Sequence, residues 1–120
     1  MSSTGSEPSI FSRIVAREIP ATIVAETDRI IAFNDIAPQA PVHVVIATKS
    51  QLYRNVVELA AGDPGLMAEL VDVARRVANK LANGQFRLVF NTGETVGQTV
   101  FHVHAHVLAG SLREGSLGFQ

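Results

Sequence analysis

The sequence predicts an α+β protein with a five-stranded antiparallel sheet, one long helix and a short N-terminal helix. Three observations support this fold class. Five short segments are rich in β-branched residues, one long segment has helical periodicity, and the strands follow one another in hairpin order. Because strands and helices do not alternate along the chain, a doubly wound parallel sheet is excluded.

Composition narrows the class of protein further. The chain has 120 residues, 47% of them hydrophobic, which fits a single domain with its own core. The absence of cysteine excludes a disulfide scaffold, a thiolate zinc site and a thiol nucleophile. A net charge of -1 argues against a nucleic-acid partner. With neither a membrane-length apolar run nor a signal peptide, we expect a cytoplasmic protein without a membrane partner.

The N-terminal part contains a tail, a helix and two strands. Residues 1–8 are polar and lack periodicity, so we expect a flexible tail. The apolar spacing in 10–15 predicts a short amphipathic helix that ends before Pro20. Segments 22–26 and 29–33 are predicted strands, joined by a tight two-residue turn.

A proline-containing loop over 34–41 leads into a third strand over 42–48. The alternation of side chains in this strand places His43, Val45 and Ala47 on one face.

A short helix over 52–60 is predicted to precede the long helix. Asp63 fits the N-cap of the long helix, Pro64 fits its first turn, and Gly84 fits the left-handed position after its end. Its apolar stripe, which needs a sheet face or a partner subunit to cover it, consists of Met67, Leu70, Ala74, Val77 and Leu81.

The last two predicted strands, 86–91 and 100–108, carry the chemistry together with the loop between them. His102, His104 and His106 alternate with apolar residues, so in a strand all three would lie on one face. This row is a poor packing solution, because every imidazole needs hydrogen-bond partners. Neutral imidazoles can attack phosphorus and protonate a leaving group, and mutual repulsion keeps neighbouring rings neutral.

The loop before the last strand supplies neutral phosphate donors. These are the amides of Asn91 and Gln98, the hydroxyl of Thr99 and backbone N–H groups around Gly97. Because the loop lacks Lys and Arg, it suits a monoanionic phosphate diester or amidate. A zinc centre built from two of these histidines and His43 is the alternative, although three histidines along a flat strand converge poorly on one ion.

Four blocks of sequence resemble one known family. Residues 102–108 resemble the His-φ-His-φ-His-φ-φ signature of the histidine triad (HIT) superfamily, where φ is apolar. Residues 35–43 resemble the Asp-Ile-x-Pro-Gln-Ala-Pro-x-His stretch of its HINT branch, the histidine triad nucleotide-binding proteins. Weaker similarities lie in 91–100 and 9–21. The resemblance spans about residues 9–110, which we take as the HIT domain, with 111–120 as a C-terminal tail.

The resemblance implies a HIT-like fold, a homodimer with a continuous ten-stranded sheet and no cofactor. It implies hydrolysis of purine nucleoside 5′-phosphoramidates, including aminoacyl-adenylates, through a covalent nucleotidyl-histidine. By position, His104 would be the nucleophile, His102 and His106 would handle phosphate and proton transfer, and His43 would orient them. Asp35 would accept the ribose hydroxyls. The expected base pocket consists of Phe11, Ile14, Phe33, Ile36 and Val45, and the expected phosphate site of Asn91, Gly97, Gln98 and Thr99.

Two departures from the family matter. Ser9 and Ser12 stand where many relatives carry Cys-x-x-Cys, so we expect no structural zinc and no other metal. The tail lacks the Trp-Pro-Pro-Gly-like end that would influence leaving-group choice. Two alternatives stay open: a diadenosine polyphosphate hydrolase, which the Pro-Gln-Ala-Pro block disfavours, and a nucleotide-binding partner protein whose hydrolysis is incidental.

Overall fold

A computed structural model describes residues 7–114 of the chain. Its elements, in order, are α1 (Ile10–Val15), β1 (Ile23–Glu26), β2 (Ile30–Asn34), β3 (Val42–Thr48), α2 (Val56–Gly62), α3 (Pro64–Leu81), β4 (Arg87–Val89), the 3₁₀ turn η1 (Glu94–Val96) and β5 (His104–Ala109). Most of the predicted tails, 1–8 and 111–120, lies outside the described residues. No helix within 7–114 is long and apolar enough to cross a membrane.

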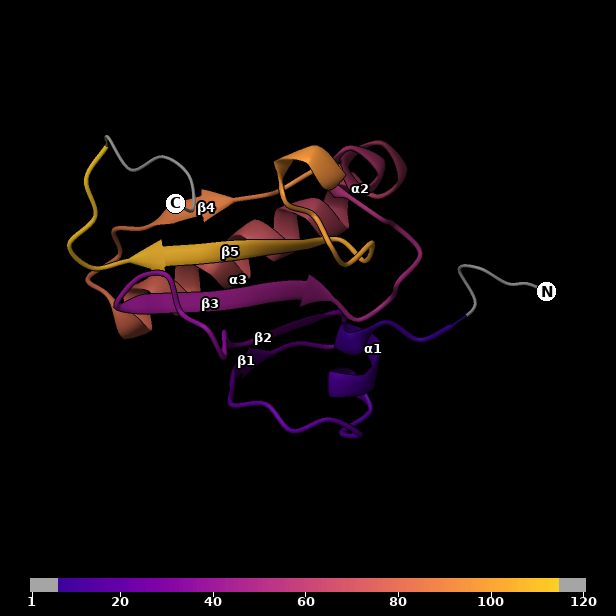
Figure 1. Ribbon diagram of the computed structural model, residues 1–120, viewed down its shortest axis with the longest axis horizontal. Helices are drawn as coiled ribbons and strands as arrows, with labels where there is room; N and C mark the ends of the chain where they lie inside the picture. Colours follow the sequence, from indigo (N-terminus) through magenta and orange to yellow (C-terminus); the bar gives the residue numbers. More distant parts are fainter. Residues whose placement is uncertain (1–6, 115–120) are drawn as a thin grey trace.

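The five strands form one antiparallel sheet in the order β1-β2-β3-β5-β4, which confirms the predicted fold class. The long helix α3 lies behind this sheet in Figure 1, whereas α1 lies away from α3, near β1 and β2. In the register of β3 with β5, Val45 is opposite His106 and Ala47 is opposite His104. The two central strands therefore bring the residues of both predicted site segments together.

Alternation along the strands divides the core into two clusters. One cluster joins the sheet to α2 and α3 and includes Val44 and Ile46. The other lies on the opposite face under α1 and includes Val45 and Ala47, as the alternation in β3 predicts. The chemistry-bearing side chains share this second face, so α3 stabilises the sheet from behind without covering the site.

Several boundaries differ from the prediction. The last strand begins at His104 rather than at residue 100, because the preceding backbone turns away and Val103 N donates to Tyr53 O at 2.9 Å. The preceding strand has three residues instead of the six of 86–91. The short helix begins at Val56 rather than at residue 52, because the side chain of Asn55 caps it.

The turn between β1 and β2 contains three residues rather than two, since Thr27 Oγ1 accepts from Ile30 N at 3.0 Å and closes a wider turn. The α3 caps are confirmed: Asp63 accepts from Leu66 N, and Gly84 has a φ of 81°. The stripe is wrong at its end, because Leu81 is 39% exposed.

Candidate active site

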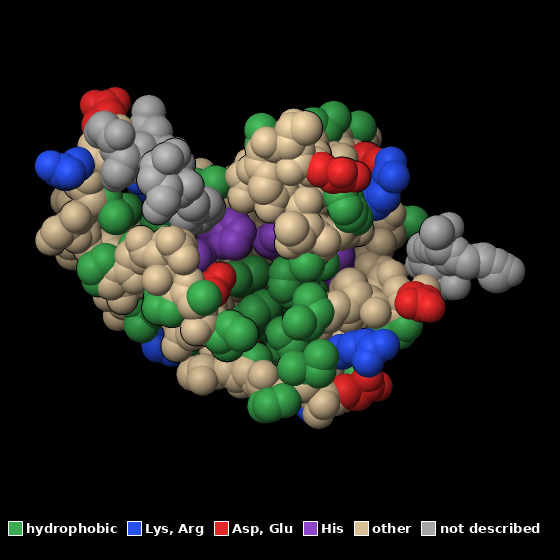
Figure 2. All heavy atoms as spheres, in the orientation of Figure 1, with side chains coloured by type: hydrophobic (Ala, Val, Ile, Leu, Met, Phe, Trp, Pro, Cys, Tyr) green, Lys and Arg blue, Asp and Glu red, His purple; other side chains and the backbone are tan. Residues whose placement is uncertain are grey.

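The sheet face opposite α3 is hollowed into a cavity of about 580 Å³. Figure 2 shows histidine side chains at the floor of this hollow and hydrophobic side chains along one wall. Twelve of the fourteen predicted site residues line the cavity: Phe11, Ile14, Phe33, Asp35, Ile36, His43, Val45, Asn91, Gly97, Thr99, His104 and His106. The other two, His102 and Gln98, are buried beside it.

The apolar wall comes from α1, β2 and β3. Phe11 and Phe33 are buried, with ring centroids 5.8 Å apart, and Val45 lies in the same cluster. Ile36 is 97% exposed and therefore lies at the rim. The segment 19–21 also lines the cavity, although Pro20 in the sequence indicates only the end of a helix. The cavity therefore has the size of a ligand pocket, and this wall has the apolar character of one.

His104 has its ring fixed by its own chain. Its Nδ1 lies 2.8 Å from the carbonyl oxygen of His102. A carbonyl can only accept, so Nδ1 carries the proton and the neutral ring keeps its lone pair on Nε2. The Phe11 ring packs edge-on against the imidazole at 4.7 Å. Burial lowers the pKa of His104, which keeps the ring neutral and nucleophilic.

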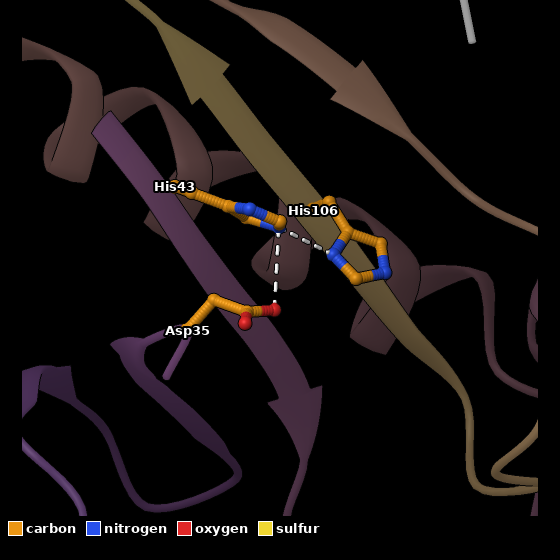
Figure 3. Close-up of side chains that lie close together, drawn as sticks. All are labelled: Asp35, His43 and His106. Atoms are coloured by element: carbon orange, nitrogen blue, oxygen red, sulfur yellow. Dashed lines mark hydrogen bonds and ion pairs between the residues drawn. The ribbon is translucent and has the colours of Figure 1, made fainter. Parts of the chain in front are cut away.

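A second chain of hydrogen bonds fixes His43 and His106 (Figure 3). Gln39 N donates to His43 Nδ1 at 2.9 Å, so the proton of the neutral His43 ring lies on Nε2. This Nε2–H donates to His106 Nδ1 at 2.9 Å. His106 therefore carries its own proton on Nε2, as a general acid requires.

Asp35 lies beside this histidine pair. Its Oδ2 is 3.4 Å from His43 Nε2, and its Oδ1 accepts from Ala37 N at 2.8 Å. Burial is the largest cause that lowers the pKa of His106 to about 4, and the neighbouring His104 and His43 add to it. Burial likewise lowers the pKa of His43. Both rings are thus neutral near pH 7, while Asp35 favours a proton that arrives during reaction.

His102 differs from its expected place at the cavity. Its ring has no exposed surface and is hydrogen-bonded on both nitrogens, to Ser9 Oγ at 2.5 Å and to Thr48 O at 2.6 Å. Burial lowers its pKa. His102 lies on the same face as His104, since Phe11 packs against both rings, but its ring is buried and does not line the cavity. Direct handling of phosphate by its ring does not fit this placement.

Gln98 also differs from its expected place. Its Oε1 accepts from Gly93 N at 2.9 Å, and its Nε2 donates to Arg54 O and Val100 O at 2.8 and 3.0 Å. The side-chain amide thus braces the loop from below instead of facing the cavity. The exposed Thr99 and Gly97, in contrast, lie at the cavity surface.

Asp35, His43 and His106 form the group of described residues that could hold a metal ion, since their ligand atoms lie within 4.8 Å of one another. Two imidazoles and a carboxylate are common zinc ligands. However, His43 Nε2 already donates its proton to His106 Nδ1, and a metal would have to displace that hydrogen bond. The hydrogen-bonded arrangement suits proton transfer, and the absence of a metal stays a prediction.

Comparisons with known proteins show which family the chain is similar to. Residues 16–112 match the family model of the HIT domain. The purine nucleoside phosphoramidase of Escherichia coli (strain K12) is 39% identical over 106 residues, which cover 87% of this chain and 88% of the relative. An uncharacterized HIT-like protein of Synechocystis sp. is 50% identical over 108 residues, covering 87% and 91%. The structure of a HIT family hydrolase from Clostridium thermocellum matches with a TM-score of 0.81 and 42% identity, covering 87% and 91%.

Proposed function

The chain belongs to the HIT domain family, and from this premise we propose that it is a hydrolase of purine nucleoside 5′-phosphoramidates. The substrate joins a nucleoside monophosphate to an amine through a P–N bond. A relative whose name states this activity is 39% identical across most of both chains. The observation that carries the proposal is the pair of assigned protons: His104 presents a lone pair to the cavity, and His106 carries a proton on Nε2.

The proposed reaction has two steps. In the first, His106 takes up a proton as the anionic substrate binds, His104 Nε2 attacks phosphorus, the P–N bond breaks, and the His106 Nε2–H protonates the departing amine, which leaves His106 neutral. The product is a covalent nucleotidyl-histidine. In the second, a water molecule loses a proton to His106 and attacks the same phosphorus, the P–His104 bond breaks, and the nucleoside monophosphate leaves.

Binding of the nucleotide would use the two sides of the cavity. The base fits the apolar wall around Phe11 and Phe33, and the carboxylate of Asp35 suits the ribose hydroxyls. Asn91, Thr99 and the backbone at Gly97 would hold the phosphate oxygens. Because these phosphate donors are neutral, they favour a singly charged phosphoramidate over a polyphosphate, which also argues against a diadenosine polyphosphate substrate.

The deciding experiment compares the wild type and His104→Ala in the hydrolysis of an adenosine 5′-phosphoramidate with a fluorescent amine. We expect the substitution to lower kcat by about 10³-fold or more, because it removes the nucleophile. Calorimetric titration with AMP is the control, and it should show binding by both proteins. AMP binding without turnover by the wild type would instead support a nucleotide-binding partner protein, and cleavage of diadenosine polyphosphate alone would support the other hydrolase.

We also propose that the protein is a homodimer. The support is β4, a strand of three residues that comes last in the sheet order within residues 7–114, because a second copy could extend the sheet at this edge. Light scattering on the eluting peak of a size-exclusion column should give twice the mass of 12.8 kDa. A monomer mass at micromolar concentration would contradict this proposal without affecting the reaction proposed above.

A further inference from the structure

We propose that Ser9 is a positioning residue for the reaction: its hydroxyl donates to His102 and thereby holds the backbone that orients His104. The inference rests on the proposed function for its role in catalysis. The contact itself links the first helix to the triad across 93 positions of sequence. Ser9 Oγ and His102 Nδ1 are 2.5 Å apart.

The direction of this hydrogen bond follows from the other partner of His102. Thr48 O can only accept, so His102 Nε2 carries the proton and the neutral ring has a lone pair on Nδ1. Ser9 must therefore donate. Its oxygen accepts at the same time from Ser12 N at 3.0 Å, which is the N-cap contact of α1. One hydroxyl thus caps the helix and donates to the lone pair of a buried histidine whose tautomer Thr48 O fixes.

The consequence for catalysis passes through His102 to His104. The backbone carbonyl of His102 accepts from His104 Nδ1 at 2.8 Å and so decides which nitrogen of the nucleophile keeps its lone pair. Phe11, two residues after Ser9, packs against both imidazole rings at 5.5 and 4.7 Å. Ser9 therefore ties a wall of the cavity to the segment that carries the nucleophile.

Gln51 holds Ser9 in this place. Its Oε1 accepts from Ser9 N at 2.8 Å and from Ser12 Oγ at 2.6 Å. Every contact in this group of four side chains is a hydrogen bond between neutral partners, so the direction of each bond depends on where the protons lie. The competing interpretation is that Ser9 only caps α1. A substitution that still caps the helix but has no proton to donate to His102 distinguishes the two interpretations.

The experiment uses four substitutions in the full chain. Ser9→Ala removes both the cap and the donor, Ser9→Asp keeps a cap acceptor but brings no proton at neutral pH, and Ser9→Thr keeps both functions. Ser12→Ala is the matched control, because it removes the contacts of Ser12 Oγ with Gln51 and with Ser9 Oγ but keeps the Ser9 hydroxyl that donates to His102. We expect Ser9→Ala and Ser9→Asp to lower kcat by about tenfold with a smaller change in KM, and Ser9→Thr and Ser12→Ala to stay within about twofold.

A second readout does not depend on turnover. Nitrogen-15 NMR of the histidine rings should show the Nε2–H tautomer of His102 in the wild type, the same tautomer with a shifted Nδ1 resonance in Ser9→Ala because Nδ1 loses its donor, and a doubly protonated ring in Ser9→Asp. An unchanged His102 spectrum in Ser9→Ala overturns the inference, and so does full kcat in Ser9→Asp. If the wild type does not hydrolyse the phosphoramidate, the proposed function fails; the spectra still decide whether Ser9 donates to His102.

Discussion

At the scale of single residues, Gln98 illustrates how a neutral loop is held in shape. Its side chain is 4% exposed and makes three hydrogen bonds to backbone groups of Gly93, Arg54 and Val100. Those three groups would lose their partner if the amide were removed. The loop that reaches the cavity through Gly97 and Thr99 depends on this brace rather than on a regular strand.

We therefore expect Gln98→Ala to lower the free energy of unfolding by about 1–3 kcal/mol, because it leaves three partly buried backbone groups without this partner. Urea denaturation followed by circular dichroism measures the change. Thr99→Ala, at an exposed neighbour, is the control and should change stability by less than about 0.5 kcal/mol. Equal stability of the two variants would contradict the bracing role, whereas equal stability combined with weaker AMP binding by Gln98→Ala would favour a direct phosphate contact.

At the scale of the elements, α3 stabilises the sheet from the face opposite the site. Leu70 is fully buried in the cluster between α3 and the sheet, whereas Leu81, at the end of the same helix, is 39% exposed. The two leucines therefore allow the same substitution to be compared at a buried and at an exposed position of one helix. The helix α3 covers the back of the sheet, and other elements shape the cavity on the opposite face.

We expect Leu70→Ala to lower the free energy of unfolding by about 2–5 kcal/mol through lost burial and a cavity, and Leu81→Ala to lower it by less than about 1 kcal/mol. Denaturant titration of both variants measures the difference. Without denaturant, at a temperature where both variants stay folded, their KM for the phosphoramidate should match that of the wild type, since neither leucine lies on the cavity side. A cost for Leu81→Ala as large as that for Leu70→Ala would restore the predicted stripe.

The elements also show how far the sequence alone could lead. Periodicity and capping residues were enough to predict α3 with its Asp63 cap, and alternation was enough to predict which face of β3 carries His43. Alternation also predicted the face of His102, since Phe11 packs against its ring and against that of His104, but alternation could not predict that the His102 ring is fully buried. Partners such as Thr48 O or Gln39 N are backbone groups whose contacts depend on the folded path, so the residue types could not reveal them.

At the scale of the whole molecule, the buried histidines couple the fold to pH. Burial is the largest cause that lowers the pKa of His43, His102, His104 and His106, the last to about 4 from an ordinary value of 6.5. In the unfolded chain these rings take up protons as the pH falls below about 6.5, while the folded protein excludes them. Between about pH 6.5 and 4 the unfolded state therefore binds more protons than the folded state.

Under this linkage the free energy of unfolding rises with pH wherever the unfolded state holds more protons, so it should fall as the pH is lowered from 6.5 toward 4. Urea titrations at pH 7.5, 6.5, 5.5 and 4.5 measure the slope. His106→Asn offers the sharpest comparison, because the Asn Oδ1 can still accept from His43 while the group that excludes a proton is gone. Its slope should be shallower than that of the wild type by up to about one proton. Parallel slopes would mean that His106 takes up its proton in the folded protein as readily as in the unfolded chain, which would contradict the lowered pKa of its buried ring.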